Sequence, residues 1–205
     1  MNELIQILTY TALAGVCIPL GGFLARIERI RPNWLENEFR HFVIAFGGGV
    51  LLAAVALVLI PEGVEHVDDG ALLVTACLLG GGVFFFLIER ILGYKRAEAP
   101  QLSAMLLDYL PESMALGGIF AAGATSGPLL AMLIGLQNIP EGFNAYRELK
   151  ALESFRHIRT LVVMLLLVLL GPFFALLGWL YLANYPMLLG SIMLFASGGI
   201  LYLIF

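Results

Sequence analysis

The sequence predicts an all-α polytopic membrane protein, because of its composition and the length of its apolar runs. Of its 205 residues, 60% are hydrophobic and only 13% are charged, and its mean hydropathy is +0.95. A soluble globular domain is nearer half apolar and a quarter charged. Apolar runs of about 20 residues recur along the chain, which is the length that a helix needs to cross roughly 30 Å of hydrocarbon. The short segments of alternating polarity that are typical of a membrane β-barrel are not found in the sequence.

The apolar runs divide the chain into seven expected membrane spans. The first run follows directly on the residues MNEL and lacks the basic segment that begins a cleavable signal peptide, so we expect it to be the first span. The connections between runs are short, so residues 1–205 are expected to form a single transmembrane domain with no inserted soluble domain. The expected spans cover residues 4–25, 42–61, 71–88, 102–122, 129–146, 160–183 and 187–205.

The basic residues all fall in loops on one side of the membrane. These loops read ARIERIRPNWLENEFRH, ERILGYKRAEAP and RELKALESFRHIR, and together they hold all 11 Lys and Arg residues. The loops of the other side, PEGVEHVDDG, AAGATSGP and ANYP, hold none. Because Lys and Arg accumulate in cytoplasmic loops, the N-terminus is predicted to lie outside. We expect a multi-pass protein of the plasma membrane, which is the inner membrane in a bacterium.

The outer loop PEGVEHVDDG gathers acidic side chains beside the end of the second span. Glu62 and His66 are four residues apart and could form a transient ligand pair for a metal ion. An acidic vestibule would concentrate divalent cations by long-range attraction. The alternative is a solvated acidic loop without a role in binding, and the sequence leaves both interpretations open. Cys17 and Cys77 lie in apolar runs, form no CxxC metal site, and are expected to be small packing residues.

Three carboxylate residues fall near the middle of the fourth and fifth spans, where the sequence is otherwise apolar. Residues 107–118 read LDYLPESMALGG and contain Asp108 and Glu112, and residues 136–146 read LQNIPEGFNAY and contain Glu141. Each acid at the centre of a membrane helix costs roughly 2.5–3.5 kcal/mol on scales derived from insertion. The expected spans contain no Lys, Arg or His to compensate this cost. A bound cation or protons are therefore expected here.

The spacing places these carboxylates and two amides on shared helix faces. Asp108 and Glu112 are four residues apart and so lie on one face of their helix. Gln137 and Glu141 have the same spacing, and Asn138 is one position round from them. The pattern L-x-x-[L/I]-P-E-[S/G] on two consecutive helices favours an ion site. The structural alternatives are protonated, hydrogen-bonded acids, and amides that join neighbouring helices.

Each of the two helices also carries a proline within this pattern. Pro111 and Pro140 have no backbone N–H, so the carbonyl groups of Leu107 and Leu136 lose their helical partners. Free carbonyl groups at membrane depth are tolerated where they line a cavity or meet an ion. Two proline-kinked helices would thus present carboxylate, amide and carbonyl oxygen atoms to each other. Such a cage suits a hard or borderline divalent cation.

These motifs resemble those of the ZIP (Zrt-, Irt-like) family of divalent metal transporters. LQNIPEG is similar to the family's fifth-span motif, HNxPEG or a Gln-led variant, and LDYLPES is similar to the fourth-span motif. VLIPEG in the second span and FASGGILY in the seventh also resemble family signatures. The likeness covers the whole chain and indicates a divergent, bacterial-type member. It implies a bundle in which inverted three-helix repeats surround two central proline-kinked helices.

The resemblance also implies a ligand set for two metal ions. Glu141 would be the shared ligand, Gln137 and Asn138 would flank it, and Asp108 and Glu112 would contribute from the fourth span. The divalent metal ion is then the transported substrate, with zinc first and manganese, iron or cadmium as further candidates. No prosthetic group is expected.

The chain departs from the family pattern at several positions. Asp108 stands where the family usually has His, Tyr109 where it has Asn, and Ser113 where it has Gly. In the sixth span Gly171 precedes Pro172, where the family often has the Glu that completes the second metal position. These departures favour one metal position over two. The loss of imidazole also shifts the ligand chemistry toward harder cations such as manganese.

The last span indicates that an eighth span, as in the family, follows residue 205. LFASGGILYLIF aligns with AFGGGVLLAAVA of the second span when Phe195 is placed on Phe46. The two spans run in opposite directions through the membrane, so the repeat would be inverted, as in many transporters. Because the pattern of the second span continues to Pro61 and Glu62, we expect the seventh span to continue as well.

The sequence therefore predicts a transporter that moves divalent metal ions toward the cytoplasm by alternating access at a site centred on Glu141. Its expected partners are metal ions, the lipid bilayer and, by resemblance, a second copy in a homodimer; no nucleic acid is expected. The alternative is a ZIP-fold protein that has lost metal transport and acts as a proton-linked carrier of another solute or as a metal sensor. An intramembrane metalloenzyme would need a motif such as HExxH. His41, His66 and His157 all lie away from the span centres, so enzymatic activity is not expected.

Overall fold

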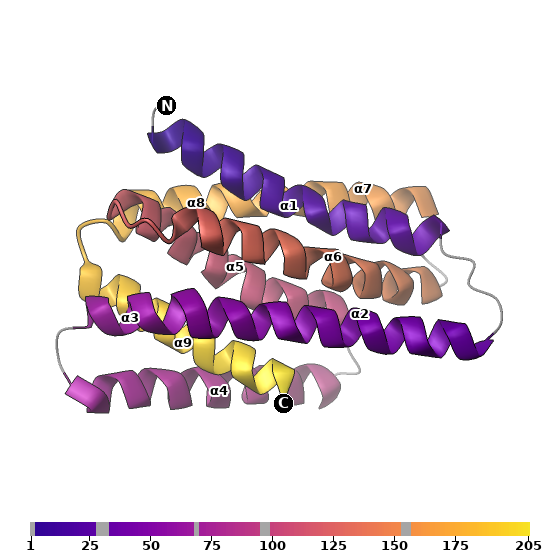
Figure 1. Ribbon diagram of the computed structural model, residues 1–205. Helices are drawn as coiled ribbons and strands as arrows, with labels where there is room; N and C mark the ends of the chain where they lie inside the picture. The colour runs from indigo at the N-terminus through magenta and orange to yellow at the C-terminus, as the bar shows by residue number, and fades with distance from the viewer. Residues whose placement is uncertain (1–2, 28–32, 68–69, 95–98, 153–156) are drawn as a thin grey trace.

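The computed structural model describes residues 3–27, 33–67, 70–94, 99–152 and 157–205, and almost all of them are helical. The helices run side by side in an elongated bundle with short connections (Figure 1). Their backbone groups are paired within each helix, as a chain in hydrocarbon requires. The helices are α1 (Glu3–Ile27), α2 (Asn33–Ala54), the π-helical segment η1 (Val55–Leu59), α3 (Ile60–His66), α4 (Gly70–Tyr94), α5 (Pro100–Ala121), α6 (Gly127–Ala151), α7 (His157–Leu167), α8 (Leu170–Tyr181) and α9 (Pro186–Ile204).

In the described part of the chain these helices form seven rods, one at each predicted span. α2, η1 and α3 follow one another without interruption, and only Val168 and Leu169 separate α7 from α8. α5 and α6 are not among the rods that are apolar enough, by composition, to cross a membrane, because the polar residues of their centres lower their hydropathy. The protein is thus a helical membrane protein with five candidate spans: Glu3–Ile27, His41–His66, Gly70–Leu92, Ile158–Tyr181 and Pro186–Ile204.

Prolines change the geometry of two rods, whereas three others are continuous, among them α1, which runs through Pro19. The π-helical segment η1 ends directly before Ile60 and Pro61. Pro172 cannot donate a hydrogen bond to the carbonyl of Val168, and the rod is interrupted at that carbonyl by the turn between α7 and α8. In contrast, α5 continues through Pro111 and α6 continues through Pro140. Each of these helices therefore keeps one carbonyl group without a helical N–H donor near its centre.

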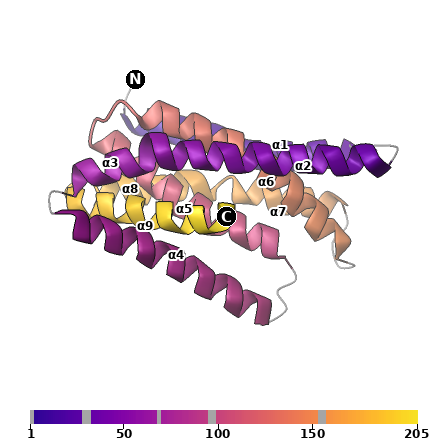
Figure 2. The same cartoon turned by 60° about the horizontal axis from the view of Figure 1, so that its bottom comes forward.

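α5 and α6 pack against each other inside the bundle, and each of the other described rods contacts at least one of them. α1 lies along α6, and α8 lies along α5. On the other side of the pair, α2 packs on α6 and α9 packs on α5, while α4 packs along α9 at the edge of the bundle (Figure 2). The polar centres of α5 and α6 are therefore surrounded by apolar helices.

Glycines let α1 and α8 approach the central pair at backbone contact distance. A Cβ atom at Gly142 of α6 would overlap the backbone of Ile18 in α1. A Cβ atom at Gly117 of α5 would overlap the backbone of Ala175 in α8 in the same manner. Small residues allow such close crossings in membrane helix bundles. The pairs α1–α6 and α5–α8 are consequently the most tightly packed partners of the site helices.

Candidate functional site

The contact between α5 and α6 brings together all five residues that the sequence predicts as a site. Asp108 is 2% exposed, and Glu112, Gln137 and Asn138 are fully buried. Glu141 is half-buried, one turn further along α6 from Gln137. The helical periodicity explains this arrangement, because Asp108 and Glu112 stack on one face of α5 while Gln137 and Glu141 stack on one face of α6. Two polar faces thus meet in the interior of an apolar bundle.

The polar groups of the two faces are partly paired with one another. The Gln137 side-chain amide donates to Oε2 of Glu112 and so links α6 to α5. The Asn138 amide donates to the backbone carbonyl of Ala14 in α1 at 2.9 Å. The carboxyl groups are near enough to interact electrostatically, Glu112 with Asp108 and Glu141 with both. Asp108, Glu112, Gln137 and Glu141 therefore interact with one another, while Asn138 joins α6 to α1. The five residues together are called the site cluster below.

Each residue of this cluster also presents a buried oxygen atom that has no hydrogen-bond partner. A buried acceptor without a donor costs about 1–3 kcal/mol, and such atoms are few in folded proteins. Five of them on two contacting helices call for a ligand that can share their lone pairs. The described part of the chain has seven buried side-chain N or O atoms without a partner: Asp108 Oδ1, Tyr109 OH, Glu112 Oε1, Ser126 Oγ, Gln137 Oε1, Asn138 Oδ1 and Glu141 Oε2.

The carboxylates alone do not form a metal site. Among the described residues no group of three or more His, Cys, Asp or Glu side chains is arranged to hold a metal ion. A cation between α5 and α6 must therefore take amide or carbonyl oxygen atoms beside the carboxylates, or draw the carboxylates together as it binds. Asp, Glu, Asn, Gln and backbone carbonyl groups are all accepted oxygen ligands of hard divalent cations.

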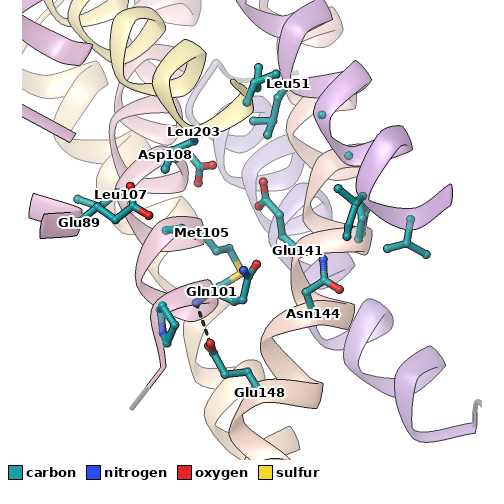
Figure 3. A pocket seen from close by; sticks show the side chains of 18 of the residues that line it. Leu51, Glu89, Gln101, Met105, Leu107, Asp108, Glu141, Asn144, Glu148 and Leu203 are labelled. Atoms are coloured by element: carbon teal, nitrogen blue, oxygen red, sulfur yellow. Dashed lines mark hydrogen bonds between the residues drawn. The ribbon is translucent and has the colours of Figure 1, made fainter. Parts of the chain in front are cut away.

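A cavity of about 900 Å³ connects two of the site carboxylates to one end of the bundle. Asp108 and Glu141 point toward each other across its deep part, and Gln101 and Glu148 lie at the other end (Figure 3). Arg147, which the sequence analysis assigned to a basic loop, lies within α6 and also lines the cavity. Glu112, Gln137 and Asn138 do not line the cavity and are covered completely.

Tyr109 neighbours Asp108 in sequence but points away from the cluster. Its ring is buried, and its hydroxyl group lies between α1 and α8 at two positions without side chains. A Cβ atom at Gly15 would come within 2.7 Å of the hydroxyl oxygen, and one at Gly171 would overlap it. The tyrosine therefore fills the space beside Gly171, where the resemblance suggested that a second metal position could have lain.

Sequence reasoning missed the residues at the open end of the cavity. Glu148 lies beyond the predicted end of the fifth span at residue 146 and was assigned to a basic loop, whereas α6 extends to Ala151. Glu89, Met105 and Asn144 also line the cavity. Asn144, in contrast, was recognised in the sequence, because it follows Glu141 by three residues and so shares its helix face. Nothing in the sequence pattern relates Glu89 to these residues.

Glu62 and His66, the ligand pair considered in the sequence analysis, interact with each other in α3 and not with this cluster. His66 Nδ1 lies 2.7 Å from the backbone carbonyl of Glu62 and 3.9 Å from Oε2 of the same residue, within α3. Asp68 and Asp69 lie outside the described residues, as does the side chain of His157.

Comparisons of the chain with models of known protein families and with curated proteins found no match. The function must therefore be argued from the residues of the site.

Proposed function

We propose that this protein is a ZIP-like membrane transporter that moves divalent cations between α5 and α6 toward the cytoplasm. The observation that carries the proposal is the cluster of five buried oxygen atoms without hydrogen-bond donors, one from each predicted site residue. The sequence has no basic residue between Arg96 and Arg147 that could pair with them. A cation is the ligand that compensates such a set of acceptors at membrane depth.

The position of the cavity supports a transport path. It runs from Asp108 and Glu141 to the end of the bundle that the positive-inside rule assigns to the cytoplasm. On the other side Glu112 and Gln137 are fully covered. This arrangement fits a state that is open to the inside and closed to the outside, with the N-terminus outside. Alternating access then requires that the covered side opens while the cavity closes.

The packing order supports the inverted repeat that the resemblance implies. α1 lies along α6 as α8 lies along α5, and α2 contacts α6 as α9 contacts α5. Each half of the bundle thus offers its helices to the central pair in the reverse order of the chain. On this proposal α5 and α6 also cross the membrane, and a second copy completes a homodimer.

The cargo follows from the donor atoms and from the space around them. Zn²⁺ is the first candidate by resemblance and accepts carboxylate oxygen. A site of carboxylate and amide oxygen atoms without imidazole or thiolate also suits Mn²⁺, Mg²⁺ or Ca²⁺. Because Tyr109 fills the space beside Gly171, we propose one cation per site.

A second function is favoured by a specific observation, the lack of a preformed group of three metal-binding side chains among the described residues. A protein with this cluster could have lost metal transport and use its three carboxyl groups to carry protons with another solute, or could sense a metal without moving it. The two functions differ in whether metal crosses the membrane.

The test is metal flux into proteoliposomes made with the full chain, using a panel of Zn²⁺, Mn²⁺, Fe²⁺, Cd²⁺, Co²⁺ and Mg²⁺. Glu141→Ala removes the central carboxylate, and Glu89→Gln is the matched control. Glu89 lines the same cavity, but its carboxylate already accepts a hydrogen bond from Tyr202. We expect saturable uptake that Glu141→Ala abolishes and Glu89→Gln retains.

Absence of flux for every metal, with metal-dependent stabilisation that Glu141→Ala removes, would favour the sensor. Absence of both flux and metal-dependent stabilisation would exclude metal as the ligand. Solute uptake that acidifies or alkalises the vesicle lumen would then identify the proton-linked carrier.

A further inference from the structure

The first turn of α5 has free backbone N–H groups that its own N-terminus does not cap. The N-cap residue Ala99 has no side chain that can accept a hydrogen bond, and Pro100 occupies the first helical position. The N–H groups of Gln101 and Leu102 follow, and in a typical helix a Ser, Thr, Asp or Asn at the N-cap position would accept from such groups. The sequence around α5 offers no such residue at residue 99.

Glu148 of α6 supplies the missing acceptors. The backbone N–H of Gln101 donates to Oε1 of Glu148 at 3.0 Å, and the N–H of Leu102 donates to Oε2 at 3.1 Å. Both oxygen atoms of one carboxylate are therefore engaged. Such hydrogen bonds are charge-assisted, and a negative charge at a helix N-terminus is further stabilised by the helix dipole. The cap comes from a residue 46 positions away in the chain, so it joins two helices.

This contact lies on the same two faces that carry the site. Glu148 follows Glu141 by seven residues on α6, and Asp108 follows Gln101 by seven residues on α5, so each pair is two turns apart on one face. All four residues line the cavity (Figure 3). The distance between Asp108 and Glu141 across the cavity thus depends on how the two helices are held at its open end.

We propose that Glu148 is a positioning residue for the cation site, which sets the separation and rotation of α5 and α6 by capping one helix from the other. Its carboxylate is engaged with the first turn of α5 at the open end of the cavity, two turns along α6 from Glu141. The effect on the cation rests on the proposed function, whereas the link between the helices does not.

The test compares a cap supplied by α6 with a cap supplied by α5 itself. Glu148→Ala removes the interhelical cap, and Ala99→Asp places an acceptor at the N-cap position of α5. In the double variant Ala99→Asp/Glu148→Ala, the first turn of α5 is capped again but is no longer tied to α6. The full chain is studied in lipid nanodiscs, with Mn²⁺ and Zn²⁺ as the probes.

We expect Glu148→Ala to weaken cation binding about tenfold, and we expect the double variant to regain thermal stability without regaining affinity. Glu148→Gln keeps one acceptor oxygen and should fall between the wild type and Glu148→Ala. Recovery of full affinity in the double variant would overturn the proposal, because helix capping alone would then suffice. Unchanged affinity in Glu148→Ala would overturn it as well.

A second measurement does not depend on cation binding. Amide hydrogen exchange at Gln101 and Leu102, with a distance measured between spin labels on the ends of α5 and α6, reports the link directly. Faster exchange and a broader distance distribution are expected in Glu148→Ala, with exchange alone restored in the double variant. If the wild type binds no cation while these changes occur, the proposed function fails and the interhelical link stands. If the distance distribution is unchanged in Glu148→Ala, the link itself is refuted.

Discussion

The contact between α4 and α9 lies at the edge of the bundle and the contact between α5 and α6 lies in its interior (Figure 2), and the two differ in their polar groups. At α4–α9, Gly81 and Gly198 bring the two backbones together so closely that a Cβ atom at either would overlap the partner helix. The hydroxyl of Ser197 donates to a carbonyl of its own helix at 2.8 Å, and Tyr202 donates to Glu89. None of the unpaired buried atoms found in the described chain belongs to α4 or α9.

At α5–α6, inside the bundle, five side chains keep an acceptor without a donor. A fold that only needed to be stable would pair these atoms or replace them with apolar groups. Close packing thus stabilises the α4–α9 contact, whereas the α5–α6 contact keeps unpaired acceptor atoms. A binding site for a cation requires such acceptors.

The largest expected effect is stabilisation of the α5–α6 contact by its cation. At a cation concentration a hundred times Kd, the free energy of unfolding should rise by about 2.7 kcal/mol, because only the folded state binds. Thermal unfolding of the purified protein with and without metal measures this rise. Glu141→Ala should remove the rise and Glu89→Gln should keep it. An equal rise in Glu141→Ala would place the cation elsewhere.

The next largest effect is expected at the contact between α4 and α9. Gly81→Ala should lower the stability of the protein by about 2 kcal/mol, because the new methyl group overlaps the backbone of α9 and overpacking carries such a cost. Gly49→Ala is the matched control, since a Cβ atom there meets nothing within 4 Å and alanine favours the helix by up to about 1 kcal/mol. Unfolding in mixed micelles compares the two variants. Equal stabilities would show that α4 and α9 are not so closely packed.

The two contacts should also respond in opposite directions when polar groups are removed. The double variant Glu112→Met/Gln137→Met deletes two unpaired acceptor atoms and the hydrogen bond between the two side chains. We therefore expect the free energy of unfolding of the metal-free protein to rise by about 1–2 kcal/mol, and transport to be lost. Ser197→Ala removes a hydroxyl group that is already hydrogen-bonded, so the free energy of unfolding should fall by about 1 kcal/mol while transport is retained. A destabilised double variant would mean that the cluster serves the fold.

The smallest effect is expected at the hydrogen bond between Tyr202 of α9 and Glu89 of α4. Tyr202→Phe removes the hydrogen bond to Glu89 while the ring packing is kept. Because this bond lies at an exposed position, stability should fall by at most about 1 kcal/mol and metal uptake should not change. A strong loss of uptake would show that Glu89 and α4 take part in the transport path.

The sequence was sufficient to predict a bundle of membrane helices and the helix faces that carry the polar residues, because both follow from local patterns. That the five candidate residues bind a cation stays a prediction. Hydropathy locates five of the rods, and the spacing of Asp108, Glu112, Gln137 and Glu141 places them on shared faces. The ends of the helices were harder to predict, since α6 continues five residues past the predicted end at residue 146. Polar residues near the C-terminal end of α6 lower the hydropathy there without ending the helix.

Contacts between distant segments could not be derived from periodicity. The link from Asn138 to the carbonyl of Ala14, the cap of α5 by Glu148, and the fit of Tyr109 beside Gly171 each join residues from different helices. The sequence shows Tyr109 where the ZIP motif has Asn, and Gly171 where that motif often has Glu. That the phenol occupies the space beside this glycine is a property of the packing.

The measurement that tests the central claim most directly is the stoichiometry of cation binding by equilibrium dialysis, with the full chain in nanodiscs and Zn²⁺ and Mn²⁺ in parallel. The account predicts one cation per chain for the wild type and for Glu89→Gln. It predicts none for Glu112→Gln/Glu141→Gln, in which two site carboxylates are neutral but the shape of the cluster is kept. Binding that persists in this double variant, or no binding by the wild type, would contradict the claim that a cation lies between α5 and α6.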